Sequence, residues 1–293
     1  MTANHWESAL QELEKNGNGL FGPKSFRDYL EDIEEDPRDY RTAAEISIDT
    51  LRQLSSELRE RETMVFRLGY APNGAGTAFA LVQLEDRLED FFVQEHQYPV
   101  SERVRLDFSQ NGQDVDLLTP QARDMLDAYR LLPNFSESSY VNLALSTGLL
   151  GRSLNLDADT IGTAPTTIAS SFSFEFRPHS RLSHELYHNN GQVEVDAIII
   201  TRKHGKRTML VIEAKTGKAR TLAKHKLFYP YLAVKNLASE DIDEIIPIYM
   251  RANAEDDKLA YDIYEGAVNS AEGQQPAIDE LTIADDYHFS IQI

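Results

Sequence analysis

Two carboxylates and a lysine stand close to the ends of two apolar segments of this chain. The first segment, residues 193–201, contains Asp196, and the second, residues 208–215, contains Glu213 and ends at Lys215. Carboxylate oxygens are the ligands that Mg²⁺ and Mn²⁺ prefer in proteins, and a lysine ammonium group donates hydrogen bonds to anions. These residue types together could hold a divalent cation and stabilise a negatively charged substrate.

The two segments are predicted to form a β-hairpin. Both are rich in β-branched residues, and His204 and Gly205 stand at the tip of the polar turn between them, which suits a two-residue loop. In that register Lys203 faces Lys206. Apolar residues then face each other in the pairs Ile200 with Met209, Ile199 with Leu210, Ile198 with Val211, Ala197 with Ile212 and Val195 with Ala214. A shift by one residue would lose this agreement.

The same register places Asp196 opposite Glu213. Because side chains alternate along a strand, it also brings Glu194 and Lys215 to the face that carries these two carboxylates. Two carboxylates that face each other repel, and a cation between them would remove this conflict. Alternatively, these charged residues have no function and lie at a solvated end of the sheet, where Glu194 and Lys215 form a surface ion pair.

This arrangement resembles the PD-(D/E)XK nuclease superfamily, whose members share the restriction-endonuclease-like fold. The family motif has an acidic residue on one strand and (Asp/Glu)-x-Lys on the next strand of a hairpin. The matching residues are Asp196 in VEVDA, and Glu213 and Lys215 in VIEAK. The proline of the motif name is absent, since Val195 precedes Asp196. The resemblance covers about the C-terminal half of the chain and implies an α/β domain, in which helices flank a mixed β-sheet.

The resemblance also implies a function, which is metal-dependent hydrolysis of DNA phosphodiester bonds by a restriction or other defence-related endonuclease. Asp196 and Glu213 would hold one or two Mg²⁺ or Mn²⁺ ions, and Lys215 would orient the attacking water and stabilise the developing charge. Many members of the family add an acidic residue from a helix to the metal site. Glu175 and Glu185 are the two candidates for it, and the residues around Glu175 fit a helix and a strand equally well.

The charges of the chain are unevenly distributed. The net charge is −19, yet residues 201–226 contain nine Lys or Arg and one acidic residue. This basic segment surrounds the predicted site, so we expect it to face phosphate groups, with Lys218, Arg220 and Lys224 contacting DNA.

Two other functions are open at this point. Residues 184–188 read HELYH, the pattern of a zinc-binding helix in metalloproteases, in which His184 and His188 would be ligands and Glu185 the general base. No amphipathic helix is visible around this segment, so the metalloprotease is the second enzymatic interpretation. A catalytically silent nuclease fold that serves as a binding or scaffold protein is the alternative from another class.

Length and composition set further limits. The chain has 293 residues, of which 41% are hydrophobic, and it has no Cys, which excludes disulfides and thiolate chemistry. The sequence also lacks an apolar run of transmembrane length and an N-terminal secretory pattern. We therefore expect a soluble, cytoplasmic protein without a membrane partner, and a homodimer is left open.

The elements around the hairpin divide the chain into two predicted parts. Residues 1–155 are predicted to be a mainly helical region for target binding or assembly, with helices within 1–62, 85–100 and 119–151 and a hairpin of residues 63–70 and 77–84. Residues 156–293 are predicted to be the nuclease domain, and small polar residues at 152–166 mark the boundary. A helix over residues 218–235 and strands at 244–250, 259–264 and 287–293 complete this domain.

Overall fold

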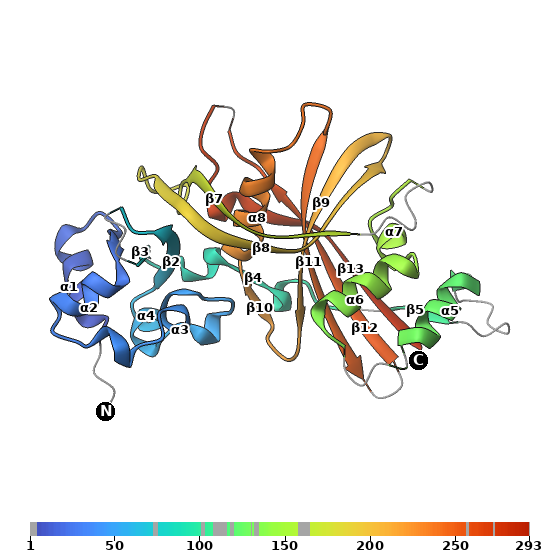
Figure 1. Ribbon diagram of the computed structural model, residues 1–293, viewed down its shortest axis with the longest axis horizontal. Helices are drawn as coiled ribbons and strands as arrows, with labels where there is room; N and C mark the ends of the chain where they lie inside the picture. Colours follow the sequence, from blue (N-terminus) through green and yellow to red (C-terminus); the bar gives the residue numbers. More distant parts are fainter. Residues whose placement is uncertain are drawn as a thin grey trace.

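A large mixed β-sheet forms the body of the molecule (Figure 1). The computed structural model describes residues 5–72, 76–100, 103–107, 116–117, 120–129, 131, 135–157, 165–255, 258–271 and 273–292. The strands of this sheet follow the order β1-β3-β2-β8-β9-β11-β12-β13-β5-β6, and β7 pairs with β8. Helices flank the sheet, which confirms the predicted α/β class with a mixed sheet.

Helices and strands alternate irregularly along the chain. The α-helices are α1 (Glu7–Asn16), α2 (Phe26–Asp32), α3 (Thr42–Ile46), α4 (Ser56–Glu60), α5 (Pro120–Tyr129), α6 (Glu137–Ser146), α7 (Leu149–Ser153) and α8 (His225–Lys235). The strands are β1 (Leu20–Ser25), β2 (Thr63–Tyr70), β3 (Thr77–Gln83), β4 (Phe92–Gln94), β5 (Val104–Asp107), β6 (Asp116–Leu117), β7 (Thr166–Phe176), β8 (Leu186–Lys203), β9 (Lys206–Thr216), β10 (Thr221–Ala223), β11 (Glu244–Glu255), β12 (Lys258–Val268) and β13 (Leu281–Gln292). Short 3₁₀ helices lie at Pro37–Asp39, Leu51–Gln53, Leu88–Phe91, Glu95–Gln97 and Ile278–Glu280.

Two hydrophobic cores lie on opposite faces of the sheet. Along β9, Val211 packs in the core that contains α8 and the N-terminal helices, whereas Ile212 packs in the core that contains α6 and α7. Side chains alternate along a strand, so Glu213 has the same orientation as Val211. The sequence of β9 therefore directs this carboxylate to the face that α8 covers.

The hairpin of β8 and β9 has the predicted register. Its ladder runs from the pair Lys203–Lys206 to the pair Ala197–Ile212. The two turn residues between the strands have φ angles of 52° and 77°, as a type I′ turn requires. The strands β11, β12 and β13 and the hairpin of β2 and β3 also form where the sequence predicts them.

A β-bulge interrupts β8 next to Asp196. On β7, Thr166 pairs with Ile198 and Ile168 pairs with Val195, so β8 has one residue more than β7 between these pairs. The side chains of β8 exchange faces at this point, since residues before and after it pack in different cores. The ladder to β9 ends here as well, so the predicted pairings of Asp196 with Glu213 and of Val195 with Ala214 are wrong.

Strands as well as helices make up the N-terminal region, which was expected to be mainly helical. The antiparallel strands β1, β3 and β2 pack with α1, α2 and α4 in one core. Residues 158–164 of the predicted boundary lie outside the described residues, and the sheet contains strands from both sides of residue 155. No helix in the described ranges has the length and apolar character to cross a membrane.

One predicted helix is wrong and another begins later than predicted, and both differences arise at the same contact. Residues 85–100 contain β4 between two 3₁₀ helices, and residues 221–223 form β10 before a helix that begins at His225 instead of Lys218. These two strands pair with each other, with Phe92 opposite Ala223. The backbone of each segment forms hydrogen bonds with a segment far away in the sequence, and local periodicity cannot reveal such a partner.

Strand β2 meets β8 at a contact between glycines. Gly69 forms a parallel bridge with Asn189. A Cβ atom built on Gly191 would lie 2.6 Å from the Cα of Gly69 and 2.4 Å from Cε1 of His188. Only glycine allows two backbones to approach this closely. The contact holds Arg67, two residues before Gly69, beside β8.

Gly191→Ala should therefore destabilise the protein by about 1–3 kcal/mol, the usual cost of forcing an additional methyl group into a packed site. Urea unfolding measures this change. Ser171→Ala serves as the control, because Ser171 is exposed on the neighbouring strand and pairs with Gln192; its effect should stay within about 0.5 kcal/mol. Equal stability of the two variants would contradict the close approach of β2 and β8.

Candidate functional site

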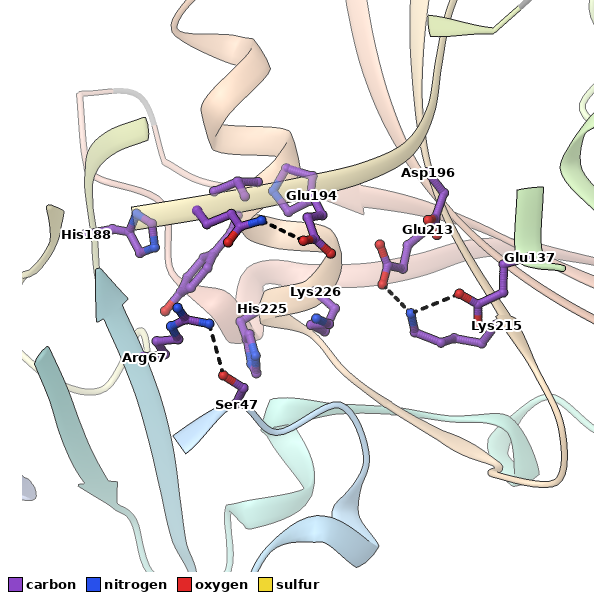
Figure 2. A pocket seen from close by; sticks show the side chains of 14 residues that line it. Ser47, Arg67, Glu137, His188, Glu194, Asp196, Glu213, Lys215, His225 and Lys226 are labelled. Carbon is purple, nitrogen blue, oxygen red and sulfur yellow. Dashed lines mark hydrogen bonds and ion pairs between the residues drawn. The ribbon is translucent and has the colours of Figure 1, made fainter. Parts of the chain in front are cut away.

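Asp196, Glu213 and Lys215 line one cavity on the face of the sheet that α8 covers (Figure 2). The cavity has a volume of about 210 Å³, and Glu194 lines it as well. The four charged side chains that were predicted to share a face therefore lie together. We call Asp196 and Glu213 the carboxylate pair.

The bulge in β8 gives Asp196 a structural contact. Its Oδ2 accepts a hydrogen bond of 2.7 Å from the backbone N–H of Ala214, which lies just beyond the end of the hairpin ladder. Within the described part of the chain, no donor is bonded to the other carboxylate oxygen. One carboxylate oxygen of Asp196 thus links β8 to β9, and the other is available to a ligand.

Burial determines the protonation of Glu213. The residue is 6% exposed, and its Oε1 lies 2.7 Å from Nζ of Lys215. Burial raises the pKa of Glu213 to about 7 although Lys215 lowers it, and the charge of Asp196 raises it further. Burial lowers the pKa of Lys215, but the attraction of Glu213 outweighs this effect and holds it above its ordinary value. Glu213 is thus partly protonated at neutral pH when no cation is bound.

The carboxylate pair fits a divalent cation that keeps part of its water shell. No group of three or more His, Cys, Asp or Glu side chains in the described ranges is arranged to hold a metal. Mg²⁺ is usually bound through one or two carboxylates, with water and substrate oxygens completing its coordination. A cation could bind the oxygen of Asp196 that accepts no hydrogen bond. It would also offset the negative charge of Asp196, which contributes to the raised pKa of Glu213.

Lys215 does not pair with Glu194, so the surface ion pair of the alternative interpretation is wrong. Its Nζ lies 2.7 Å from Glu213 and 3.9 Å from Oε2 of Glu137, the first residue of α6. Glu194 instead accepts a hydrogen bond of 2.7 Å from Nε2 of Gln192. Two acids thus hold the ammonium group of Lys215 at the cavity.

Apart from His188 of the HELYH segment, the opposite end of the cavity is built from residues that the sequence did not single out. Figure 2 shows Arg67 of β2, Ser47, His188 and His225 at this end, which we call the arginine end, and Tyr229 of α8 belongs to it. The ring of Tyr229 lies 5.0 Å from that of His188 and 5.4 Å from that of His225.

Two sequence signals could have indicated the arginine end. Arg67 is the one charged residue in the apolar strand TMVFRLGY. His225 and Tyr229 are four residues apart in a helix, a spacing that places both side chains on one face.

Both histidines of the arginine end are neutral at physiological pH. Burial, reinforced by the nearby charge of Lys226, lowers the pKa of His225 to about 3. Burial also lowers the pKa of His188 to about 4, and Arg67 contributes to this effect. Neutral imidazoles offer one donor and one acceptor each, so this end of the cavity is polar and its permanent charge comes from Arg67.

The three residues predicted to contact DNA lie outside the cavity lining. Lys218 is exposed. Arg220 lies 3.2 Å from Oε2 of Glu95, and burial lowers the pKa of Lys224, whose Nζ lies 3.5 Å from the backbone oxygen of Asp279. Acidic residues from other elements thus offset part of the basic segment, and contact with DNA stays a prediction for these three residues.

The acidic residues proposed to complete the metal site lie elsewhere. Residues 166–176 form β7, and Glu175 is exposed on that strand between two buried phenylalanines. Glu185 lines a separate surface cavity. Neither residue lines the cavity of the carboxylate pair.

The segment HELYH lacks the helix that a metalloprotease site needs. His184 lies outside any helix, two residues before β8, and His188 lies within the strand. Four residues of extended chain span about 13 Å, whereas the same spacing in a helix brings side chains within about 6 Å. Nδ1 of His188 instead lies 3.2 Å from the backbone oxygen of Phe172.

Comparisons with known proteins place the chain in a family. No curated protein matches it, and no solved structure does. A family model described as "Domain of unknown function (DUF6997)" matches residues 107–266. The matched region contains the carboxylate pair, Lys215, His188, His225 and Tyr229, and it extends over more than half of the 293 residues. The chain therefore belongs to the DUF6997 family.

Proposed function

We propose that this protein hydrolyses DNA phosphodiester bonds in a metal-dependent reaction at the carboxylate pair, as an endonuclease with a restriction or other defence role. The observation that carries the proposal is the convergence of Asp196, Glu213 and Lys215 on one cavity, where a buried carboxyl group faces a second carboxylate. The match of these residues to the PD-(D/E)XK motif supports the same reaction.

The residues of the carboxylate pair would hold the cation, Mg²⁺ or Mn²⁺. When bound, it would polarise the scissile phosphate and acidify the attacking water. In the reaction the water oxygen forms a bond to phosphorus, the bond to the leaving sugar oxygen breaks, and that oxygen takes up a proton. The products are one phosphate monoester and one hydroxyl group.

Lys215 would stabilise the charge that develops on the phosphate. Two acids fix its ammonium group at the cavity, 2.7 Å from Glu213 and 3.9 Å from Glu137. A donor that is oriented before the reaction costs no reorganisation during it. Asp196 contributes in a second way, because its bond to Ala214 keeps β8 and β9 at a fixed distance.

The test is incubation of the purified protein with plasmid, linear and single-stranded DNA in the presence of Mg²⁺ or Mn²⁺, with EDTA as the control. We expect cleavage with either cation and none with EDTA. A calorimetric titration with each cation complements this assay. Absence of both cation binding and cleavage would favour the binding or scaffold protein instead.

Lys215→Met should lower the cleavage rate by about 100-fold or more, the usual effect of losing one oriented donor. The assay is best performed at pH 8.5, because the pKa of Glu213 is about 7 and this carboxylate is then ionised in the wild type. Cation binding should persist, since a charged lysine is no ligand. Lys206→Met at the exposed hairpin tip is the matched control, and equal rates for the two variants would remove Lys215 from the mechanism.

A further inference from the structure

A positive charge stands at the arginine end of the cavity without an acidic partner. Arg67 is half-buried, its Nη1 lies 3.3 Å from the hydroxyl of Ser47, and no described carboxylate pairs with it. The lysines of the same cavity are paired, Lys215 with Glu213 at 2.7 Å and Lys226 with Asp49 at 2.9 Å. An unpaired guanidinium group in a cavity favours an anionic ligand, above all a phosphate or carboxylate.

Two buried polar atoms of residues at the arginine end also lack partners. The hydroxyl of Tyr229 and Nδ1 of His225 are buried without a hydrogen bond to any described residue. Leaving such a group unpaired costs about 1–3 kcal/mol, and a native structure seldom tolerates this without a reason. Both groups can donate to an oxygen atom, His225 in the tautomer that carries its proton on Nδ1.

The orientation of α8 adds to this preference for an anion. The helix has 11 residues and begins at His225, and no side chain caps its first turn. The N-terminus of a helix carries a partial positive charge and free backbone N–H groups. A ligand bound between Arg67 and Tyr229 would thus meet donors from both β2 and α8.

The dimensions of the cavity favour a single strand over a duplex. Its volume of about 210 Å³ lies below the roughly 300–1,000 Å³ of typical small-molecule sites, so it accommodates part of one strand. Arg67 and Gln192 also line a second cavity of about 240 Å³. Tyr70 lines that cavity and is 55% exposed, and an exposed aromatic ring offers a surface on which a base can stack.

We propose that Arg67, Tyr229 and His225 bind a second phosphate of a single nucleic-acid strand whose scissile phosphate lies at the carboxylate pair. The assignment of the two phosphates rests on the proposed function, because the carboxylate pair defines the first position. Glu194 and Lys226 lie between the two positions (Figure 2). The arrangement favours a strand with two phosphates in register over an intact duplex.

The test isolates the arginine end by working in EDTA, where no hydrolysis occurs. Thymidine 5′-monophosphate is the probe, thymidine is its uncharged counterpart, and isothermal titration measures both affinities. Arg67→Gln should weaken binding of the monophosphate tenfold or more, the effect of one lost charged hydrogen bond. Arg59→Gln is the control, because Arg59 is exposed on α4 and lines neither cavity.

Tyr229→Phe provides a second variant that does not depend on the stability of Arg67→Gln. The Tyr229 hydroxyl bonds to no described residue, so its removal should leave the fold intact and weaken monophosphate binding severalfold. Equal affinity for thymidine and its monophosphate in the wild type, or unchanged binding in both variants, would overturn the inference. Retained monophosphate binding in a protein that cleaves no DNA with Mg²⁺ would contradict the proposed function alone.

Competition tests the choice of strand. A single-stranded oligonucleotide of 12 thymidines should displace the monophosphate at a concentration at least tenfold lower than its duplex with 12 adenosines. Equal displacement by the two would overturn the assignment to a single strand.

Discussion

Asp196→Asn and Glu213→Gln should each reduce metal-dependent cleavage of DNA by about a thousandfold or more. Each variant removes one of two carboxylate ligands, and the charge stabilisation that a bound cation supplies is worth several kcal/mol, where every 1.36 kcal/mol is a factor of ten in rate. The rate of plasmid cleavage under saturating Mg²⁺ measures the loss.

The choice of substitution at each position follows from the hydrogen bonds. Asparagine keeps an oxygen that can accept the bond from the N–H of Ala214, whereas alanine would leave this group without a partner at a cost of about 1–3 kcal/mol. Glu194→Gln is the matched control, since Glu194 is exposed in the same cavity. Rates within tenfold of the wild type in both test variants would remove the carboxylate pair from the reaction.

Glu213→Gln should also make the metal-free protein more stable at alkaline pH. In the wild type the pKa of Glu213 rises from 4.5 to about 7 through burial, so the folded state holds a proton that the unfolded state releases. The contribution of Glu213 to stability is therefore fully present below pH 4.5 and is lost as the pH rises to about 7, by about 3 kcal/mol in total. Glutamine has no proton to lose, and the variant should gain this amount at pH 8.5 and little at pH 4.

Urea unfolding in EDTA at several pH values measures this difference. Addition of Mg²⁺ at pH 8.5 should reverse the order, because a cation at a thousand times its Kd stabilises only the protein that binds it, by about 4.1 kcal/mol. Stability curves that run parallel between pH 4 and pH 8.5 would show that the Glu213 carboxyl group has its ordinary pKa. A residue that lowers stability in the free protein and raises it with a ligand is typical of a functional site.

The sequence predicted the hairpin well, because the information lies within the hairpin itself. The turn residues His204 and Gly205 determine a two-residue loop, and apolar side chains agree on both strands in one register. The alternation of side chains predicted the wrong pairing at Asp196, where β8 has one additional residue in a bulge. A bulge leaves the apolar composition of a strand unchanged, so the sequence does not reveal it. The bulge is nevertheless what gives Asp196 its bond to the neighbouring strand.

Long-range contacts account for the other differences. The helix expected at residues 85–100 is replaced by a strand that pairs with residues 221–223. The sequence of neither segment indicates that it pairs with the other. The arginine end was missed for the same reason. Arg67 reaches the site through the contact of Gly69 with β8, and a single arginine in an apolar strand indicates an unusual position without showing which distant residues it meets.

The cavity is assembled from segments inside and outside the region that the family model matches. The family match covers residues 107–266 and with them the carboxylate pair, Tyr229 and His225. Arg67 and Ser47 lie outside it, on the N-terminal elements that Gly69 joins to β8. A relative that kept the matched region and carried a different N-terminal segment would retain the carboxylate end and exchange the group opposite it. The two ends of the cavity can thus vary independently of each other, because only the carboxylate end lies wholly within the matched region.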